Sequence, residues 1–162
     1  MLYKGYVETK GKASIEKLKN RTTWKTYDEV KNLNGFGGVL ADDTILIDID
    51  DSDQSEILMN IVEELQLDCK VLCTSRGKHF LFKNRTIARN RTHVQLAVGL
   101  TADIKVGSKL SYEVIKIDGE ERFCEWDIEE GGKYQEVPKW LFPVKALSLI
   151  HISEPTRLDV IS

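Results

Sequence analysis

The sequence predicts an α+β fold, with mixed or antiparallel sheets and flanking helices. A short strand pattern at 45–50 is followed by helical spacing of apolar residues at 53–65. The later chain alternates short strands with turns, which is typical of antiparallel pairing. With 162 residues, 41% hydrophobic and 30% charged, the chain can bury the core of one domain. A second full domain is not expected.

The first forty residues predict two short helices and a glycine-rich strand. One helix is expected within 10–20, starting near Ser14, and Thr26 with Glu29 forms the capping box of a second. That second helix is expected to run through Leu33 and to end at 34–35. The glycines of 35–40 are not followed by Gly-Lys-Ser/Thr, so close packing or the beginning of a strand is expected there rather than a phosphate-binding loop.

The strand at 45–50 carries carboxylates where a core strand normally carries apolar residues. Alternation places Leu46, Asp48 and Asp50 on one face and the isoleucines on the other. Two unpaired acids roughly 6 to 7 Å apart along a strand repel each other, and a divalent cation removes that cost. The alternative is a solvated turn from strand to helix. Asp53, three residues before Glu56, is the expected N-cap of the following helix.

The remaining elements are strands and turns. Cys69–Cys73 and Lys78–Phe82 read as strands around a turn at 75–77, and irregular basic sequence follows to about His93. A further strand is expected at 102–106. Two more, at 111–117 and 122–126, are expected to form a hairpin turned at Asp118-Gly119.

Polar residues interrupt two of these later strands as well. Alternation places His79 and Leu81 on one face of their strand, with Phe80 and Phe82 on the other. A lone histidine of this kind is more often a hydrogen-bonded core group, and Asp103 with Lys105 could be a surface ion pair. Strand acids and histidines that gather usually mark a functional site.

The segment 75–102 contains six basic residues and no acidic one, although the whole chain has a net charge of −3. Such a segment could bind phosphates, or it could be a solvated loop that balances acidic neighbours. Its basic residues are Arg76, Lys78, Lys83, Arg85, Arg89 and Arg91.

Three segments in this order resemble motifs of the archaeo-eukaryotic primase superfamily, over most of residues 1–146. Ile45–Asp50 is similar to its hydrophobic strand with Asp-x-Asp, and Thr74–Phe82 resembles its turn before a strand histidine. Ala102–Lys105 resembles its third motif, a strand with one more acid. The resemblance is to phage and plasmid primase-polymerase domains and implies an RRM-like catalytic core.

The resemblance implies a template-dependent nucleotidyltransferase that uses two Mg²⁺ or Mn²⁺ ions. Asp48, Asp50 and Asp103 would bind the metal, and His79 would contact the phosphates of the incoming nucleotide. The expected partners are a single-stranded DNA template, a primer, nucleoside triphosphates and a fused or associated helicase. Further triphosphate contacts are expected from Arg76, Lys78 and Lys105, and template contacts from Arg85, Arg89 and Arg91.

The chain departs from the family pattern at two places. Relatives often carry two glycines before the histidine, whereas this chain has Arg76-Gly77-Lys78, and only part of a glycine- and proline-rich stretch follows Asp103. Two other functions remain open: a non-catalytic replication-initiator or DNA-binding module on the same fold, and a metal-dependent nuclease.

Three further expectations concern the whole chain. The cysteines Cys69, Cys73 and Cys124 lack zinc-ligand pairing and are expected to be reduced and mostly buried. No apolar signal core opens the chain, so a cytoplasmic location in a bacterial host cell is expected. Residues 147–162 begin with a segment that resembles a translated sequencing-library adapter, so the native domain is expected to occupy 1–146 and to continue beyond it in the natural protein.

Overall fold

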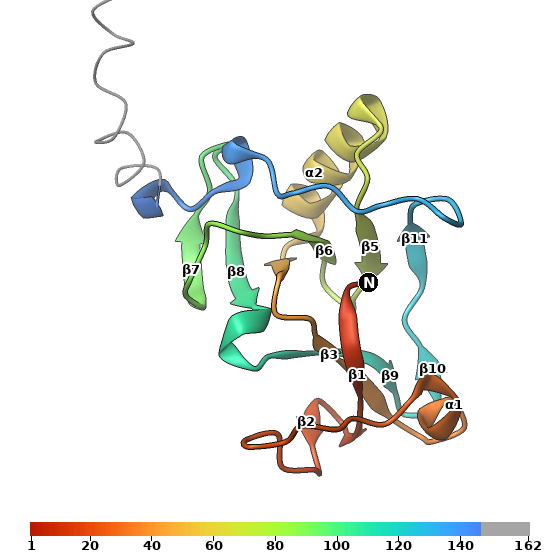
Figure 1. The fold of residues 1–162 in the computed structure, drawn as a ribbon. Helices are drawn as coiled ribbons and strands as arrows, with labels where there is room; N and C mark the ends of the chain where they lie inside the picture. Colours follow the sequence, from red (N-terminus) through yellow and green to blue (C-terminus); the bar gives the residue numbers. More distant parts are fainter. Residues whose placement is uncertain (147–162) are drawn as a thin grey trace, which may run out of the picture.

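The computed structural model describes residues 1–146, which fold into two antiparallel sheets and one long helix (Figure 1). This confirms the α+β class. The expectation for residues 147–162 lies outside the described residues. The helices are α1 (Tyr27–Val30) and α2 (Ser52–Leu65), with short 3₁₀ turns at Gly107–Lys109 and Lys139–Leu141. The strands are β1 (Tyr3–Lys10), β2 (Ala13–Ser14), β3 (Phe36–Leu40), β4 (Thr44–Ile49), β5 (Lys70–Cys73), β6 (Lys78–Lys83), β7 (Arg91–Gln95), β8 (Thr101–Val106), β9 (Tyr112–Ile117), β10 (Glu120–Glu121) and β11 (Cys124–Trp126).

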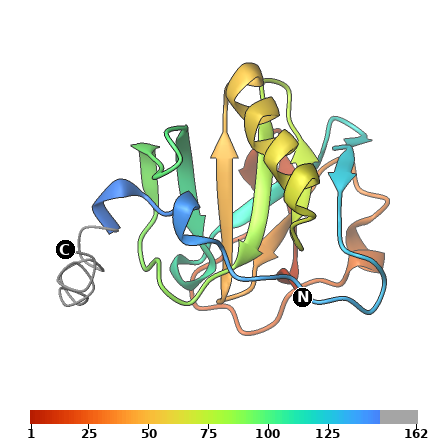
Figure 2. The ribbon, with the colours of Figure 1, turned by 90° about the horizontal axis from the view of Figure 1, so that it is seen from above.

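The larger sheet has the strand order β11-β5-β6-β4-β8-β7, and α2 lies across β4 and β6 (Figure 2). The main core fills the space under the helix, where Ile45, Ile47 and Phe80 are almost fully buried against Leu58 and Val62. The N-cap of α2 is Asp51, which accepts a hydrogen bond from the Gln54 amide. The expectation of Asp53 as the cap was therefore wrong by two residues, and Asp53 lies in the first turn.

The smaller sheet has the order β10-β9-β3-β1-β2, and it packs against the other face of the larger one. Between the two sheets Leu46 of β4 and Leu81 of β6 meet Leu2 and Leu40. The alternation predicted for β4 and β6 is thus confirmed, because their isoleucines and phenylalanines face α2 while Leu46 and Leu81 face the second sheet. The next pair on this face is Asp48, two residues after Leu46, and His79, two residues before Leu81. The apolar space between the sheets therefore becomes polar there.

Several expected elements differ from the observed ones. The helix expected near Ser14 is absent from the described chain, because residues 13–14 pair with β1 as β2. The capping box of Thr26 and Glu29 is confirmed, although α1 ends already at Val30. The irregular stretch expected up to His93 contains the start of β7.

The hairpin expected at the end of the domain is confirmed at its turn and corrected at its second strand. Asp118 and Gly119 have φ of 49° and 85°, as a two-residue turn of type I′ requires, and they join β9 to β10. Residues 124–126 then leave this sheet and pair with β5 as β11. The chain crosses between the sheets at Arg122–Phe123, which brings Arg122 close to the space between them.

Two expectations about the whole chain can be compared with the structure. All three cysteines are free, but only Cys69 is buried, and Cys124 is exposed. Within residues 1–146 no helix has both the length and the apolar character needed to span a membrane.

Candidate active site

Asp48, His79 and Asp103 lie side by side on the three adjacent strands β4, β6 and β8. Asp48 is the register partner of His79 on one side and of Asp103 on the other. Directly paired residues of antiparallel strands project to the same face. All three side chains therefore lie on the face of the large sheet opposite α2, as alternation along β4 and β6 predicted.

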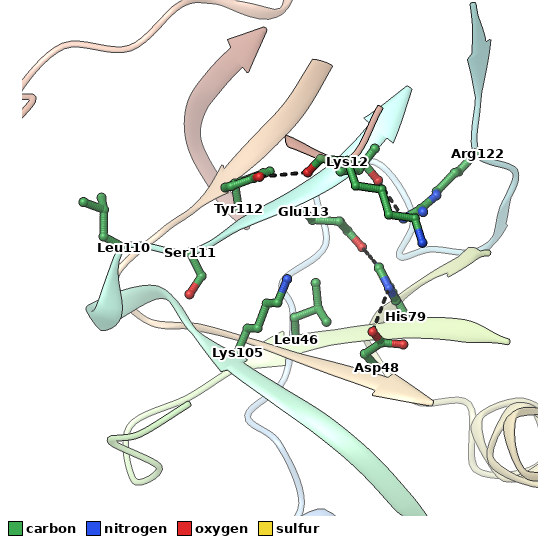
Figure 3. A pocket seen from close by; sticks show the side chains of 11 residues that line it. Lys12, Leu46, Asp48, His79, Lys105, Leu110, Ser111, Tyr112, Glu113 and Arg122 are labelled. Carbon is green, nitrogen blue, oxygen red and sulfur yellow. Dashed lines mark hydrogen bonds and ion pairs between the residues drawn. The ribbon is translucent and has the colours of Figure 1, made fainter. Parts of the chain in front are cut away.

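His79 is held between two carboxylates that come from different sheets (Figure 3). Its Nδ1 lies 2.8 Å from Oε2 of Glu113 on β9, and its Nε2 lies 3.5 Å from Oδ2 of Asp48. Burial opposes the charged ring, but hydrogen bonds and charges of Asp48 and Glu113 outweigh it and raise the pKa of His79. The arrangement favours an imidazolium that donates from both nitrogens.

Asp48 is shifted in the opposite direction. Burial of the carboxyl opposes ionisation, but the hydrogen bond from His79 and the nearby charges of His79, Lys105 and Arg122 lower the pKa of Asp48. Both shifts favour the charged forms of the pair, an aspartate beside an imidazolium. The Asp48 carboxylate thus lies near three basic side chains, those of His79, Lys105 and Arg122.

Glu113 was not among the residues expected from the sequence. Its side chain is fully buried, with no exposed area, and it accepts hydrogen bonds from the Tyr3 hydroxyl as well as from His79. Burial, followed by the charge and hydrogen bond of Glu113, raises the pKa of Tyr3 well above its usual value. The only sequence signal for Glu113 was an acid inside a strand, and nothing local related it to His79.

A cavity of about 310 Å³ opens beside His79 between the two sheets. Lys12, Lys105 and Arg122 point into it from different elements, together with His79 (Figure 3). Of these cations only Lys105 and His79 were expected. The cavity, which we call the basic cavity, is also lined by Leu46, Asp48, Leu110, Ser111, Tyr112, Glu113 and Val114.

A second cavity of about 310 Å³ lies at the ends of β4 and β8. It contains all three expected metal ligands, and we call it the carboxylate cavity. Its lining consists of Asp48, Asp50, Asp51, Gln54, His93, Thr101, Ala102 and Asp103. Asp48 is the residue that lines both cavities, so they meet at its side chain.

The carboxylates of this second cavity already have partners in the protein. Oδ1 of Asp103 accepts a hydrogen bond of 2.7 Å from the backbone N–H of His93. His93 has a φ of 52° and lies where the register between β7 and β8 shifts. Asp50 forms a 2.9 Å ion pair with Arg76. Among residues 1–146, no three Asp, Glu, His or Cys side chains are arranged closely enough to hold one metal ion as they stand.

The turn before His79 explains the single glycine of Arg76-Gly77-Lys78. A Cβ on Gly77 would lie 1.8 Å from the Ile49 carbonyl oxygen, so no side chain fits there. Thr74 closes the turn, because its Oγ1 and backbone N–H both bond to Gly77. The glycine thus brings the turn against the end of β4, where Asp50 follows.

The other expected phosphate-binding residues are placed less favourably. Lys78 lies on the α2 side of β6, nearly buried, and pairs with Glu56 and Glu125 rather than facing the space around His79. Arg76 is largely exposed and reaches Asp50.

The three arginines expected at the template line neither cavity. Arg85 is exposed and pairs with Glu136 at 2.7 Å. Arg89 is exposed in the segment between β6 and β7. Arg91 begins β7, and its Nε is buried without a hydrogen-bond partner among the described residues.

No protein-family model matches this chain, and neither a curated protein nor a solved structure matches it significantly.

Proposed function

We propose that this chain is the catalytic domain of a template-dependent nucleotidyltransferase, a primase-polymerase of phage or plasmid replication. The observation that carries the proposal is the position of Asp48, which lines a carboxylate cavity on one side and a basic cavity on the other. Phosphoryl transfer needs carboxylates that can hold divalent metal next to cations that hold a polyphosphate. The two requirements meet at one strand residue.

The order of the strands supports the same function. β4 and β5 are joined through α2 and lie in one sheet with β6 between them, and β8 pairs with the other edge of β4. This strand order resembles the split β-α-β arrangement of ferredoxin-like and RRM-like sheets. In such a fold a second helix connects the strands that correspond to β6 and β8. In this chain the connecting segment contains β7 instead, which pairs with β8 at the edge of the sheet. An RRM-like core of the primase type is therefore part of the proposal.

The carboxylates fit Mg²⁺ or Mn²⁺ in chemistry, and they line one cavity. Asp48 and Asp103 are direct neighbours across a strand pair, and Asp50 lines the same cavity. All three offer the hard oxygen ligands that these ions prefer. To share an ion, Asp103 has to turn from the His93 amide and Asp50 from Arg76. When bound there, the metal would activate the primer hydroxyl and neutralise the charge that develops on the phosphates.

The protein residues would do the positioning. His79 of β6, Lys105 of β8 and Arg122 after β10 converge on the basic cavity. The nitrogen atoms of Lys105 and Arg122 can bind oxygens of a triphosphate there, and Nε2 of His79 can do so when it turns from Asp48. Glu113 keeps the His79 ring in place with both nitrogens as donors. Lys12 would contribute a fourth positive charge from the loop between β1 and β2.

A non-catalytic binding module remains the second candidate. The observation that favours it is the pairing of each expected metal ligand with a protein group, namely Asp48 with His79, Asp50 with Arg76 and Asp103 with the His93 amide. Such a module would bind nucleic acid without metal and would show no stabilisation by nucleoside triphosphate.

The test is primer extension on a primed single-stranded template, with Mg²⁺ and with Mn²⁺. We expect metal-dependent extension that is lost in Asp48→Asn and in Asp103→Asn. The matched control is Asp53→Asn, because Asp53 is an exposed acid in the same region that lines neither cavity. A folded parent chain that extends no primer with either metal, and that dTTP does not stabilise, would favour the non-catalytic module. Cleavage of labelled DNA without added nucleotide would point to a nuclease.

A further inference from the structure

A third cavity, of about 480 Å³, lies beside β1 of the smaller sheet and shares no lining residue with the two already described. Four aromatic side chains line it, from Tyr3, Tyr6, Trp24 and Tyr134. Three lysines line it as well, namely Lys4, Lys25 and Lys70, and none of the described residues in its wall is acidic. A hollow with rings and positive charges but no carboxylate fits an anionic ligand that also has flat apolar faces.

Two glycines, Gly5 and Gly38, allow the rings of Trp24 and Tyr3 to pack directly against the backbone. A Cβ on Gly5 would lie 2.1 Å from Cβ of Trp24, and a Cβ on Gly38 would lie 2.5 Å from the Tyr3 ring. Any side chain at these two strand positions would push the rings away. The rings of Trp24 and Tyr3 are thus fixed directly against the backbone of β1 and β3, and they lose little conformational freedom when a ligand stacks nearby.

The lysines remain able to bind an anion. Lys4 pairs with Asp42, but that carboxylate is 81% exposed, so the pair is solvated and weak. Lys70 is placed with its Nζ 5.2 Å from the centre of the Tyr3 ring. Lys25 is held by Glu16, which also binds Arg21, so two cations share that single carboxylate.

From this cavity we infer a binding site for single-stranded nucleic acid, in which a base stacks on the aromatic rings and the lysines contact its phosphates. Proteins that bind single strands without sequence preference combine stacking rings with a positively charged groove. A base in a duplex has both faces covered by its neighbours and cannot enter such a hollow. The cavity volume is within the range of small-molecule pockets and leaves room for one nucleotide.

Tyr3 joins this cavity to the candidate active site. Its ring lines the cavity, and its hydroxyl donates to Glu113, which holds His79. A nucleic-acid strand bound in this cavity would therefore be connected to His79 through two side chains, those of Tyr3 and Glu113. The inference extends the proposed function but does not depend on it, because it concerns binding without chemistry.

The test measures fluorescence anisotropy of labelled oligo-dT, oligo-U and an abasic oligomer of the same length, with EDTA present. We expect oligo-dT to bind more tightly than the abasic strand and more tightly than duplex DNA. Trp24→Leu should weaken binding roughly tenfold, and Trp24→Phe should restore most of it, since base–aromatic stacking contributes this much per base. Lys70→Glu should weaken binding and make it less dependent on salt.

Matched controls lie on the exposed surface outside the cavity. Phe123→Leu removes an aromatic ring that is 68% exposed, and Lys133→Glu reverses an exposed lysine. Both should bind as the parent does. Preferred binding of oligo-U would identify RNA rather than DNA as the natural strand and would still support the site.

Two results would overturn the inference. One is equal affinity for the abasic oligomer or for duplex DNA, which would mean that only phosphates are recognised. The other is parent-like affinity of both Trp24→Leu and Lys70→Glu. If Trp24→Leu does not fold, as judged by its thermal midpoint, Lys70→Glu and the abasic strand decide alone. Since the probe carries no triphosphate and no metal is present, failure here leaves the proposed polymerase chemistry untouched.

Discussion

Glu113 lies 2.8 Å from Nδ1 of His79 and is fully buried, although the two residues belong to different sheets. The contact joins β9 of the small sheet to β6 of the large one at the level of Asp48. Because a buried carboxylate needs its hydrogen bonds, this pair ties the relative position of the sheets to the orientation of the histidine ring.

We expect Glu113→Gln to lower the free energy of unfolding by about 1–3 kcal/mol, measured by urea denaturation. Glutamine keeps the volume, but it has one acceptor oxygen where Glu113 accepts from both His79 and Tyr3. One buried donor therefore loses its partner. Glu121→Gln, at an exposed acid of the same hairpin, should change stability little. A parent-like midpoint for Glu113→Gln would contradict the role assigned to this contact.

The same pair gives a pH dependence. The pKa of His79 is raised above 6.5 in the folded protein, so its contribution to stability is complete below pH 6.5 and is lost as pH rises through the raised value. We therefore expect the difference in unfolding free energy between the parent and His79→Gln to shrink as pH increases above 6.5. Urea denaturation at a series of pH values measures it, and a difference that grows with pH would have the wrong sign.

The basic cavity should bind triphosphate through side chains that the sequence did not all reveal. We expect Arg122→Ala and Lys105→Ala each to weaken the binding of dTTP roughly tenfold, because a charge-assisted hydrogen bond is lost. Isothermal titration calorimetry measures the affinity. Lys133→Ala removes an exposed lysine outside the cavity and serves as the control. Unchanged affinity in both cavity variants would remove the basic cavity from the proposed site.

Local alternation predicted one half of the site and long-range packing determined the other. Asp48 and His79 were predicted on the correct faces, because a strand's period of two is independent of its surroundings. Glu113 and Arg122 belong to the β9–β10 hairpin, which pairs with β3, a strand distant in the sequence, and no local pattern predicts that pairing. No local pattern predicts that Lys12 lines the same cavity either.

For Lys78, strand alternation and the basic composition of its segment lead to different predictions. Alternation along β6 places Lys78 with Phe80 and Phe82, on the face opposite His79. Its position in a basic segment suggested phosphate binding instead. The helix α2 supplies Glu56 and the distant β11 supplies Glu125, so the nearly buried ammonium is paired within the protein.

Lys78 should therefore matter for stability and not for nucleotide binding. We expect Lys78→Met to lower the free energy of unfolding by about 1–3 kcal/mol, less than for a fully buried pair because Glu56 is 56% exposed and stays solvated. Burial opposes its charge, but hydrogen bonds to Glu125 and Glu56 raise its pKa, so this contribution is complete at neutral pH. The affinity of the folded variant for dTTP should equal that of the parent. A loss of dTTP affinity without a loss of stability would return Lys78 to the site.

Glu16 holds the loop that carries Trp24. Its carboxylate accepts from Arg21 at 2.9 Å, from Lys25 at 2.7 Å and from the backbone N–H of Glu8. Burial alone would raise its pKa, but these bonds lower the pKa of Glu16 to about 2. The group therefore contributes stability that is present above pH 4.5 and lost as pH falls through about 2.

We accordingly expect Glu16→Gln to destabilise the protein at pH 7 and to have almost no effect near pH 2, measured by thermal unfolding at both values. At pH 7 the variant should also bind oligo-dT more weakly if Trp24 forms the nucleic-acid site, because the loop from 16 to 25 loses its anchor. Glu64→Gln, at an exposed acid on α2, should show neither effect. Destabilisation by Glu16→Gln without any change in oligo-dT affinity would separate the loop's structural role from binding and would count against Trp24 as the stacking ring.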